Sequence, residues 1–214
     1  RDVAVIVRGP LASGLLTGEI TKETKFAEND HRNYNIKGGA FDVGDTFSGV
    51  NLDRGFEAVE RLKKQFPDIK YIIAGEGKEK ITLQQFVKKH DLNKNVFFVG
   101  NVNDQQKRQL FEHTTLMVMP TLDESYNRSI EGFGISYLEA AFFGIPSVAS
   151  KVGGTPEAVL HKKTGIIIDN HEQLFEILRE LLLDNNKLKY LGENAKKRAE
   201  ELFTWDRVVN NYLS

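Results

Sequence analysis

The chain has 214 residues, 40% of them hydrophobic, so it can form one large or two small domains with a substantial core. Its 29 Lys and Arg residues nearly balance its 30 Asp and Glu residues, which excludes a global field favouring nucleic acid or an anionic membrane. It has no cysteine, which excludes disulfides and thiol chemistry and is consistent with a cytoplasmic location. No apolar run is long enough for a transmembrane helix.

Residues 1–60 differ in composition from the rest of the chain. The first eight (RDVAVIVR) are too short and wrongly flanked for a secretory signal and predict a strand. After residues 10–18, some thirty residues rich in Gly, Asn, Asp, Lys and Thr predict little regular structure. We therefore divide the chain near residue 60 and expect an irregular or edge-strand segment before it. If that segment packs on the sheet, residues 47–50 should supply an edge strand; if not, the fold should begin at about residue 55.

From residue 68 onward, short β-rich apolar runs alternate with helical stretches, and Gly, Pro or Asn marks each change of period. This pattern is typical of a parallel α/β fold. The predicted strands cover residues 69–74, 95–99, 115–119, 146–149 and 164–168. The predicted helices cover about residues 55–65, 80–90, 104–113, 132–143, 155–160, 171–183, 187–202 and 204–213. The sequence thus predicts a doubly wound parallel sheet, Rossmann-like in organisation, over residues 61–214.

The segment EGFGISYLE carries the strongest functional signal. Seven residues separate Glu131 from Glu139, and a Gly-Phe-Gly turn follows Glu131. If a helix starts at Gly132 to Gly134, its free N–H groups and positive dipole end form a receptor for a diphosphate. Glu139 then lies about 12 Å along the axis from Glu131, roughly the reach of a sugar-diphosphate-ribose. The alternative is a solvated pair of carboxylates beside an ordinary turn.

The loops that follow the predicted strands should meet at one edge of the sheet, because right-handed crossovers place the carboxyl ends of parallel strands together. These loops are residues 75–77, 100–102, about 120–134 and the pair Gly153 and Gly154. A paired glycine after a buried strand permits close approach of a ligand to the backbone; the alternative is a turn with no ligand. We expect a nucleotide-sugar site at this edge.

From about residue 68 to its end, the chain resembles the C-terminal, donor-binding half of a family 4 retaining glycosyltransferase of the GT-B architecture. The resemblance covers about 145 residues, and its motifs occur in order. They are PDIKYIIAGEG (67–77), NVFFVG (95–100), LMVMP (116–120), EGFGISYLEA (131–140), GIPSVA (144–149), GGTPEAV (153–159), TG (164–165) and FTW (203–205). The resemblance implies glycosyl transfer from a nucleotide sugar without a cofactor or divalent metal, because a helix dipole and basic side chains would neutralise the diphosphate.

The resemblance also implies roles for individual residues. Glu131 would be the catalytic participant beside the donor hexose. The substrate-binding residues would be Glu139 at the ribose, Gly132, Phe133 and Gly134 at the phosphates and sugar, Asn101 and Val102 beside the base, and Gly75, Gly153 and Gly154 in the neighbouring loops. The Arg and Lys with which the family grips the diphosphate fall near Val50 and Arg54, so one cation is absent and Arg54 is the candidate for the other. The alternative for Arg54 is a solvent-exposed residue at a helix start.

The first 55 to 62 residues resemble a different family, a stretch of the aldo-keto reductase barrel near the strand whose loop meets the nicotinamide cofactor. The motifs are VIVRGPLASGLLTG (5–18), FAENDHRNYN (26–35) and FDVGDTFSGV (41–50). The Asp, Tyr, Lys and His tetrad of that family would lie outside this stretch, and His31 and Tyr34 are interpreted as polar loop residues. We therefore expect a chimeric N-terminus and no reduction by this chain.

Three hypotheses follow. The first is a donor-binding glycosyltransferase module, weakly active or inactive alone, whose partners are a nucleotide sugar and a separate acceptor-binding domain or subunit. The second is an NADPH-dependent aldo-keto reductase fragment, and the third is a non-catalytic partner subunit of a split glycosyltransferase. None involves nucleic acid or a metal, since the histidines from residue 90 onward lack a metal-ligand spacing. Phe142 and Phe143 are expected to pack in the core.

Overall fold

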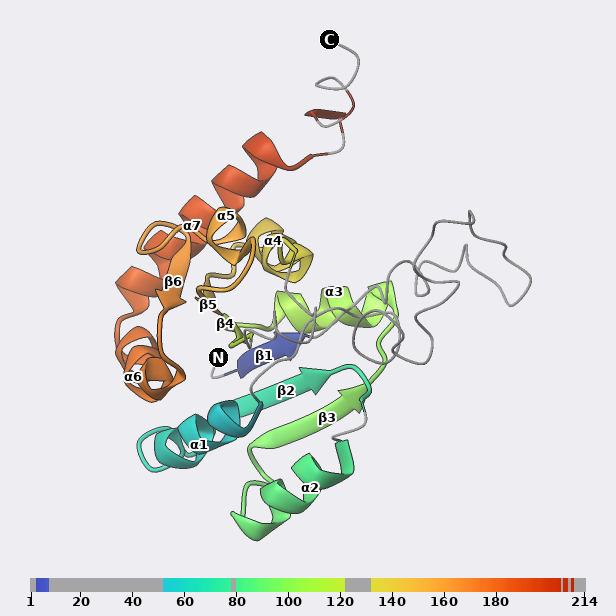
Figure 1. Ribbon diagram of the computed structural model, residues 1–214, viewed down its shortest axis with the longest axis vertical. Helices are drawn as coiled ribbons and strands as arrows, with labels where there is room; N and C mark the ends of the chain where they lie inside the picture. Colours follow the sequence, from blue (N-terminus) through green and yellow to red (C-terminus); the bar gives the residue numbers. More distant parts are fainter. Residues whose placement is uncertain are drawn as a thin grey trace, which may run out of the picture.

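The computed structural model describes residues 3–7, 52–77, 80–121, 132–204, 206, 207 and 209, with backbone alone in residues 3–7 and 52–54. These residues form a sheet of six parallel strands in the order β3-β2-β1-β4-β5-β6 (Figure 1). The strands are β1 (Val3–Val7), β2 (Lys70–Ala74), β3 (Val96–Gly100), β4 (Leu116–Met119), β5 (Ser147–Ser150) and β6 (Gly165–Ile168). This is the strand order of doubly wound dinucleotide-binding folds, so the predicted fold class is confirmed.

The helices follow the strands in alternation, as the sequence pattern predicted. They are α1 (Leu52–Leu62), α2 (Lys80–Lys89), α3 (Asp104–Glu112), α4 (Ile135–Phe142), α5 (Thr155–Ala158), the 3₁₀ helix η4 (His171–Gln173), α6 (Leu174–Leu183) and α7 (Asn185–Leu202). Within the described part of the chain, none of them combines the length and the apolar character that a membrane crossing requires. The predicted helix at residues 204–213 falls largely outside the described residues.

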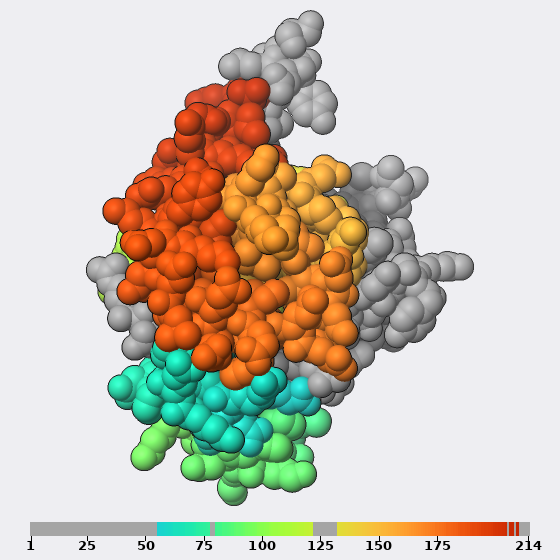
Figure 2. Space-filling model, turned by 90° about the vertical axis from the view of Figure 1, so that its left-hand side faces the viewer, coloured from blue at the N-terminus to red at the C-terminus, as the bar shows by residue number. Residues whose placement is uncertain are grey.

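Each face of the sheet has its own layer of helices, and β4 shows how the sequence builds both. Leu116 and Val118 belong to the apolar cluster beneath α1, α2 and α6, whereas Met117 and Met119 belong to the cluster beneath α3, α4 and α5. All four are buried, which explains the unbroken apolar run, since strands of a parallel sheet are covered on both faces. Figure 2 shows this side of the molecule, where α6 packs against α1 and α7 packs against α6.

β1 is the strand predicted at the start of the chain, and it lies inside the sheet. It pairs with β2 from Val3 opposite Lys70 to Val7 opposite Ala74, and with β4 through Ala4 opposite Leu116. An all-apolar pentapeptide suits a strand with a neighbour on each side. The predicted boundary near residue 60 falls within α1. Residues 8–51, which include the proposed edge strand at 47–50 and most of the aldo-keto reductase resemblance, lie outside the described residues.

Candidate functional site

The strand order reverses between β1 and β4, and the site is built on the α4 side of this switch point. In doubly wound sheets, ligands bind in the crevice beyond the carboxyl ends of the strands at such a point. The loop that leaves β4 here reaches the N-terminus of α4, while the connection after β3 reaches α3. Both helices thus begin at the carboxyl edge of the sheet (Figure 1).

A glycine turn precedes α4, and the helix begins at its end. Gly134 is the N-cap, with φ 88° and ψ 59°, so the helix starts at Ile135 rather than at Gly132. The left-handed φ suits glycine, and a Cβ on Gly134 would also collide with the ring of Tyr137. The Tyr137 hydroxyl donates to the carbonyl oxygen of Met119 at 2.7 Å, which ties the first turn of α4 to the end of β4.

The backbone of this turn is available for a ligand within the part of the chain that is described. No described residue accepts a hydrogen bond from the N–H of Gly132, Phe133 or Gly134. These amides stand just before the positive end of α4, an arrangement that favours an anion. Residues 132–134 thus form the turn before the helix instead of its first residues, and their role as a receptor for a diphosphate stays a prediction.

Gly154 brings the second predicted glycine segment against this turn. A Cβ on Gly154 would collide with the carbonyl oxygen of Gly132 and lie 3.0 Å from Cα of Phe133. Its neighbour Gly153 has a left-handed φ of 53°. The Thr155 hydroxyl donates to the Ser150 carbonyl and accepts from the Val152 amide, which fixes the connection between β5 and α5. The glycine pair thus makes room for the backbone of the turn.

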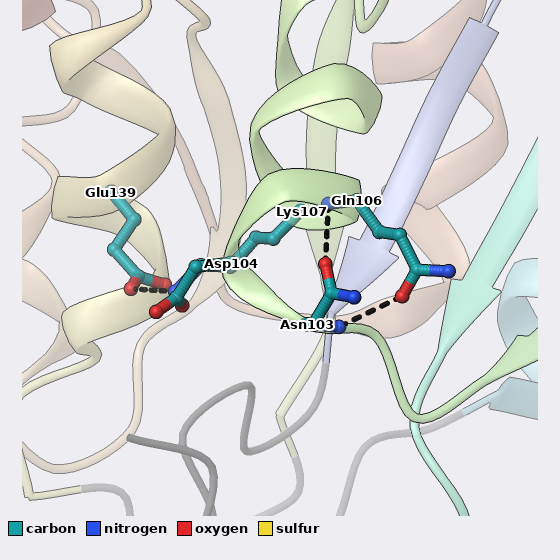
Figure 3. A network of polar contacts seen from close by, with 5 residues as sticks. All are labelled: Asn103, Asp104, Gln106, Lys107 and Glu139. Atoms are coloured by element: carbon teal, nitrogen blue, oxygen red, sulfur yellow. Dashed lines mark hydrogen bonds and ion pairs between the residues drawn. The ribbon is translucent and has the colours of Figure 1, made fainter. Parts of the chain in front are cut away.

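Glu139 points from α4 toward α3, where Lys107 meets it (Figure 3). Lys107 Nζ donates to Glu139 Oε1 at 2.7 Å and lies 3.5 Å from Asp104 Oδ1. Only 14% of the Lys107 side chain and 19% of the Glu139 side chain are exposed. Glu139 Oε2 is buried and has no hydrogen-bond donor among the described residues. A buried acceptor without a donor is costly, so Oε2 is the atom of this site that most needs a ligand hydroxyl.

Lys107 is the functional residue that sequence reasoning missed. Its helix is marked by a capping box, in which Asn103 Oδ1 accepts from the Gln106 amide and Gln106 Oε1 accepts from the Asn103 amide, each at 2.9 Å (Figure 3). The box fixes where α3 starts and hence which side of it faces α4. The sequence pattern predicted α3 but not its contact with α4. Lys107 and Glu139 lie 32 residues apart in the chain, so the pairing does not follow from local pattern.

The predicted substrate-binding residues after β2 and β3 offer fewer groups to a ligand. The Gly75 amide donates to the Gly100 carbonyl at 2.7 Å, so within the sheet it is already used. Asn101 is exposed, whereas the Val102 side chain is buried in the apolar cluster under α3 and α4. A base lying beside these two residues would therefore meet the Asn101 side chain and backbone, and not the side chain of Val102.

The side chains of two predicted site residues are not among those described. Glu131 lies outside the described residues, and Arg54 is described by its backbone alone, as the third residue of α1. Because α1 leads into β2, its first turn lies at the carboxyl edge of the sheet, the same edge as the turn before α4. Within the described part of the chain, no group of three or more His, Asp or Glu side chains could hold a metal ion.

Phe142 and Phe143 depart from the predicted core positions. They are 36% and 40% exposed, and Phe143 packs on Phe111 with ring centroids 5.3 Å apart. Together with polar residues of α3 and with Glu139 they line a shallow hollow of about 250 Å³. Lys107 and Glu139 both line this hollow, so it adjoins the buried ion pair.

Comparisons with known proteins identify the family of the chain. The protein family described as glycosyl transferases group 1 matches residues 29–198. A GDP-mannose-dependent monoacylated alpha-(1-6)-phosphatidylinositol monomannoside mannosyltransferase from Corynebacterium glutamicum is 30% identical over 156 residues, 72% of this chain and 40% of its own length. A related mannosyltransferase from Mycobacterium tuberculosis is 26% identical over 154 residues, 71% of this chain and 40% of its own length. The chain thus spans about two fifths of the length of these relatives.

Solved structures share the fold. The C-terminal domain of a glycosyl transferase group 1 family protein from Francisella tularensis superposes with a TM-score of 0.61 at 22% identity, over 72% of this chain and 80% of that one. Anabaena HepE in complex with UDP gives a TM-score of 0.68 at 19% identity, over all of this chain and 48% of that one. The architecture is therefore the Rossmann-like half of a GT-B glycosyltransferase. The chain belongs to the group 1 glycosyl transferases.

Proposed function

We propose that this chain is the donor-binding module of a retaining, metal-independent family 4 glycosyltransferase, and that it binds a nucleoside-diphosphate sugar at the edge between β1 and β4. The observation that carries the proposal is the buried Oε2 of Glu139, which has no donor among the described residues and stands one helix turn beyond an anion-receptive glycine turn. A ribose hydroxyl would supply the missing donor. The diphosphate would then lie at the amides of Gly132 to Gly134.

Each residue would have a distinct part in the transfer. Negative charge develops on the departing diphosphate, and the turn amides, the positive end of α4 and Arg54 would stabilise it. Positive charge develops on the anomeric carbon, and Glu131 would stabilise or orient the sugar there. Asn101 would lie beside the base. The acceptor would come from a separate domain or subunit that also excludes water.

The names of the relatives support a sugar nucleotide as the ligand without fixing which one. The corynebacterial and mycobacterial relatives are named as GDP-mannose-dependent, and HepE was solved with UDP and with UDP-glucose. We therefore leave the base and the hexose open and propose the class alone. An NADPH-dependent reductase is the alternative that the same experiment separates.

The test is calorimetric titration of the purified chain with UDP-glucose, GDP-mannose, ADP-glucose and NADPH, each with and without EDTA. We expect one sugar nucleotide to bind with the same affinity in EDTA, and E139Q to weaken it by at least about fivefold, because a neutral amide accepts a hydroxyl less strongly than a carboxylate. E193Q is the matched control, since Glu193 lies exposed on α7 in a 3.8 Å pair with Lys189. Binding of NADPH alone would overturn the proposal.

Retention is tested separately, by supplying an acceptor domain and determining the anomeric configuration of the product by NMR. The product anomer should match that of the donor. Inversion would contradict the retaining assignment while leaving donor binding intact.

A further inference from the structure

The Lys107–Glu139 pair differs from the other lysine pairs on the described surface. Lys189 and Glu193 on α7 are 3.8 Å apart with 75% and 68% of their side chains exposed, as is typical of solvated helix pairs. Lys187 and Glu180 join α7 to α6, but 64% of the Glu180 side chain is exposed. Lys107 and Glu139 are both mostly buried and stand 2.7 Å apart. Burying an ammonium and a carboxylate is costly unless both are fully hydrogen-bonded. Here the carboxylate is bonded through one oxygen among the described residues.

Among the charged residues near the Glu139 carboxylate, Lys107 is the one that donates a hydrogen bond to it. Asp104, Lys107, Arg108 and Glu139 are the charged residues lining the hollow. Arg108 Nε donates to Glu112 Oε1 at 2.9 Å in an exposed pair on α3, and Asp104 is exposed at the helix start. Lys107 alone of these cations donates to Glu139, and it does so only through Oε1.

We infer that Lys107 is a positioning residue that donates to Oε1 of Glu139 and so leaves Oε2 as the carboxylate oxygen with both lone pairs open to a ligand hydroxyl. The inference rests on the proposed function, because the hydroxyl is that of the nucleotide ribose. A carboxylate with both oxygens free can accept equally from two neighbouring hydroxyls. With Lys107 on Oε1, the hydroxyl that meets Oε2 should be recognised more strongly than its neighbour, so Lys107 determines how this chain distinguishes ribose from its deoxy forms.

The first arm of the test uses the unmodified chain and needs no variant. UDP, GDP and ADP are titrated calorimetrically, and the one that binds is compared with its 2′-deoxy and 3′-deoxy forms. We expect loss of one hydroxyl to weaken binding about tenfold or more and loss of the other to weaken it less than about threefold, because a charge-assisted hydrogen bond is lost in only one case. Equal losses for the two deoxy forms would overturn the inference.

The second arm removes the cation with K107M, which keeps an unbranched side chain of nearly the same length. Oε1 of Glu139 then loses its donor, so both carboxylate oxygens can accept from ligand hydroxyls. We expect the ratio between the affinities of the two deoxy forms to fall toward one in K107M. The ratio should stay unchanged in the matched control K189M on α7. Asp104 and Arg108 remain in every protein tested.

The outcomes separate the inference from the proposed function. If none of the three nucleotides binds the unmodified chain, the proposed function fails and the inference fails with it. If a nucleotide binds but K107M retains the hydroxyl preference of the unmodified chain, the inference alone is wrong. Circular dichroism shows whether K107M is folded. If it is not, the titrations of the unmodified chain with the two deoxy nucleotides still decide the result.

Discussion

Two buried polar atoms lack a hydrogen-bond partner among the described residues, and they lie in opposite layers of the fold. One is the hydroxyl oxygen of Tyr71, in the layer with α1 and α2; the other is Oε2 of Glu139, in the layer with α3 and α4. Tyr71 is enclosed by apolar groups: its ring meets Phe56 edge-on at 6.0 Å, and its hydroxyl lies over Gly55, where a Cβ would collide with it. Glu139 has a cation beside it and a hollow next to it.

The surroundings of the two atoms differ, and this difference indicates which of them belongs to a ligand site. Burial raises the pKa of Tyr71 well above its ordinary value, because desolvation penalises the charged form. Within the described part of the chain, its hydroxyl has no partner and lies in the apolar cluster beneath α1 and α2, so we interpret it as a cost of packing. Glu139 stands on the edge where the strand order reverses, one turn beyond a glycine turn whose amides have no acceptor among the described residues. Position in the fold therefore decides which of the two atoms belongs to a site.

The largest expected effect is that of G154A. This substitution tests whether the contact of Gly154 with the glycine turn is needed for the site beside α4. The new methyl group would collide with the Gly132 carbonyl, so the turn has to move. We expect a loss of up to about 3 kcal/mol in the free energy of unfolding, as for other overpacking substitutions. Chemical denaturation measures it, and loss of nucleotide binding should accompany it.

G132A is the matched control for that change. No described residue lies within 4 Å of the position that a Cβ on Gly132 would occupy, so the same methyl group should alter stability by less than about 0.5 kcal/mol. Equal destabilisation by both substitutions would show that the contact between the two glycine segments is not what holds the turn.

Breaking the buried ion pair should have the next largest effect. K107M leaves a mostly buried carboxylate without a cation, and we expect a loss of about 2 kcal/mol in unfolding free energy. The double variant K107M with E139L should recover much of this loss, since an apolar pair of similar volume needs no partners. Denaturant titrations of the single and double variants measure the coupling. Simple additivity of the two changes would mean that the pair contributes nothing to the contact between α3 and α4.

Much of the fold was predictable from local pattern, and the outcome at particular residues shows why. β4 was expected at residues 115–119 and found at Leu116–Met119, because a continuous apolar run bounded by polar residues and Pro120 permits few other structures. The strand at the start of the chain was also expected, but its place between β2 and β4 depends on pairing with residues more than sixty positions away. Strand identity is local information, whereas strand order is not.

The same limit applies to the site. Glu139 and the glycine segments were predicted because their spacing along one element already suggests their chemistry. Lys107 was not, because its meaning depends on how α3 packs beside α4. Phe143 was expected in the core and instead lines the hollow by Glu139, since its side of the helix end was not fixed by the pattern. Contacts between elements are what the sequence pattern left undetermined.

The smallest effect near neutral pH should come from Y71F, which removes the hydroxyl without a partner. We expect the free energy of unfolding to stay unchanged or to rise by up to about 1 kcal/mol, because an unsatisfied group is removed and no hydrogen bond is lost. A fall of more than about 1 kcal/mol would show that the hydroxyl does have a stabilising contact.

At alkaline pH, the free energies of unfolding of the unmodified chain and of Y71F should differ more clearly. The pKa of Tyr71 is raised in the folded state, so its contribution is fully present below the unfolded pKa near 10 and is lost as the pH rises above that value. The unmodified chain should therefore lose about 1.4 kcal/mol per pH unit more than Y71F above pH 10. Identical alkaline profiles would contradict the burial of this hydroxyl.

Hydrogen–deuterium exchange with and without the nucleoside diphosphate that binds tests the central claim most directly. The account predicts slower exchange on binding at the amides of residues 132–137, in the glycine turn and first turn of α4, with no change at α2 on the far edge of the sheet. Protection that is absent from residues 132–137 and appears at α2 instead would contradict it.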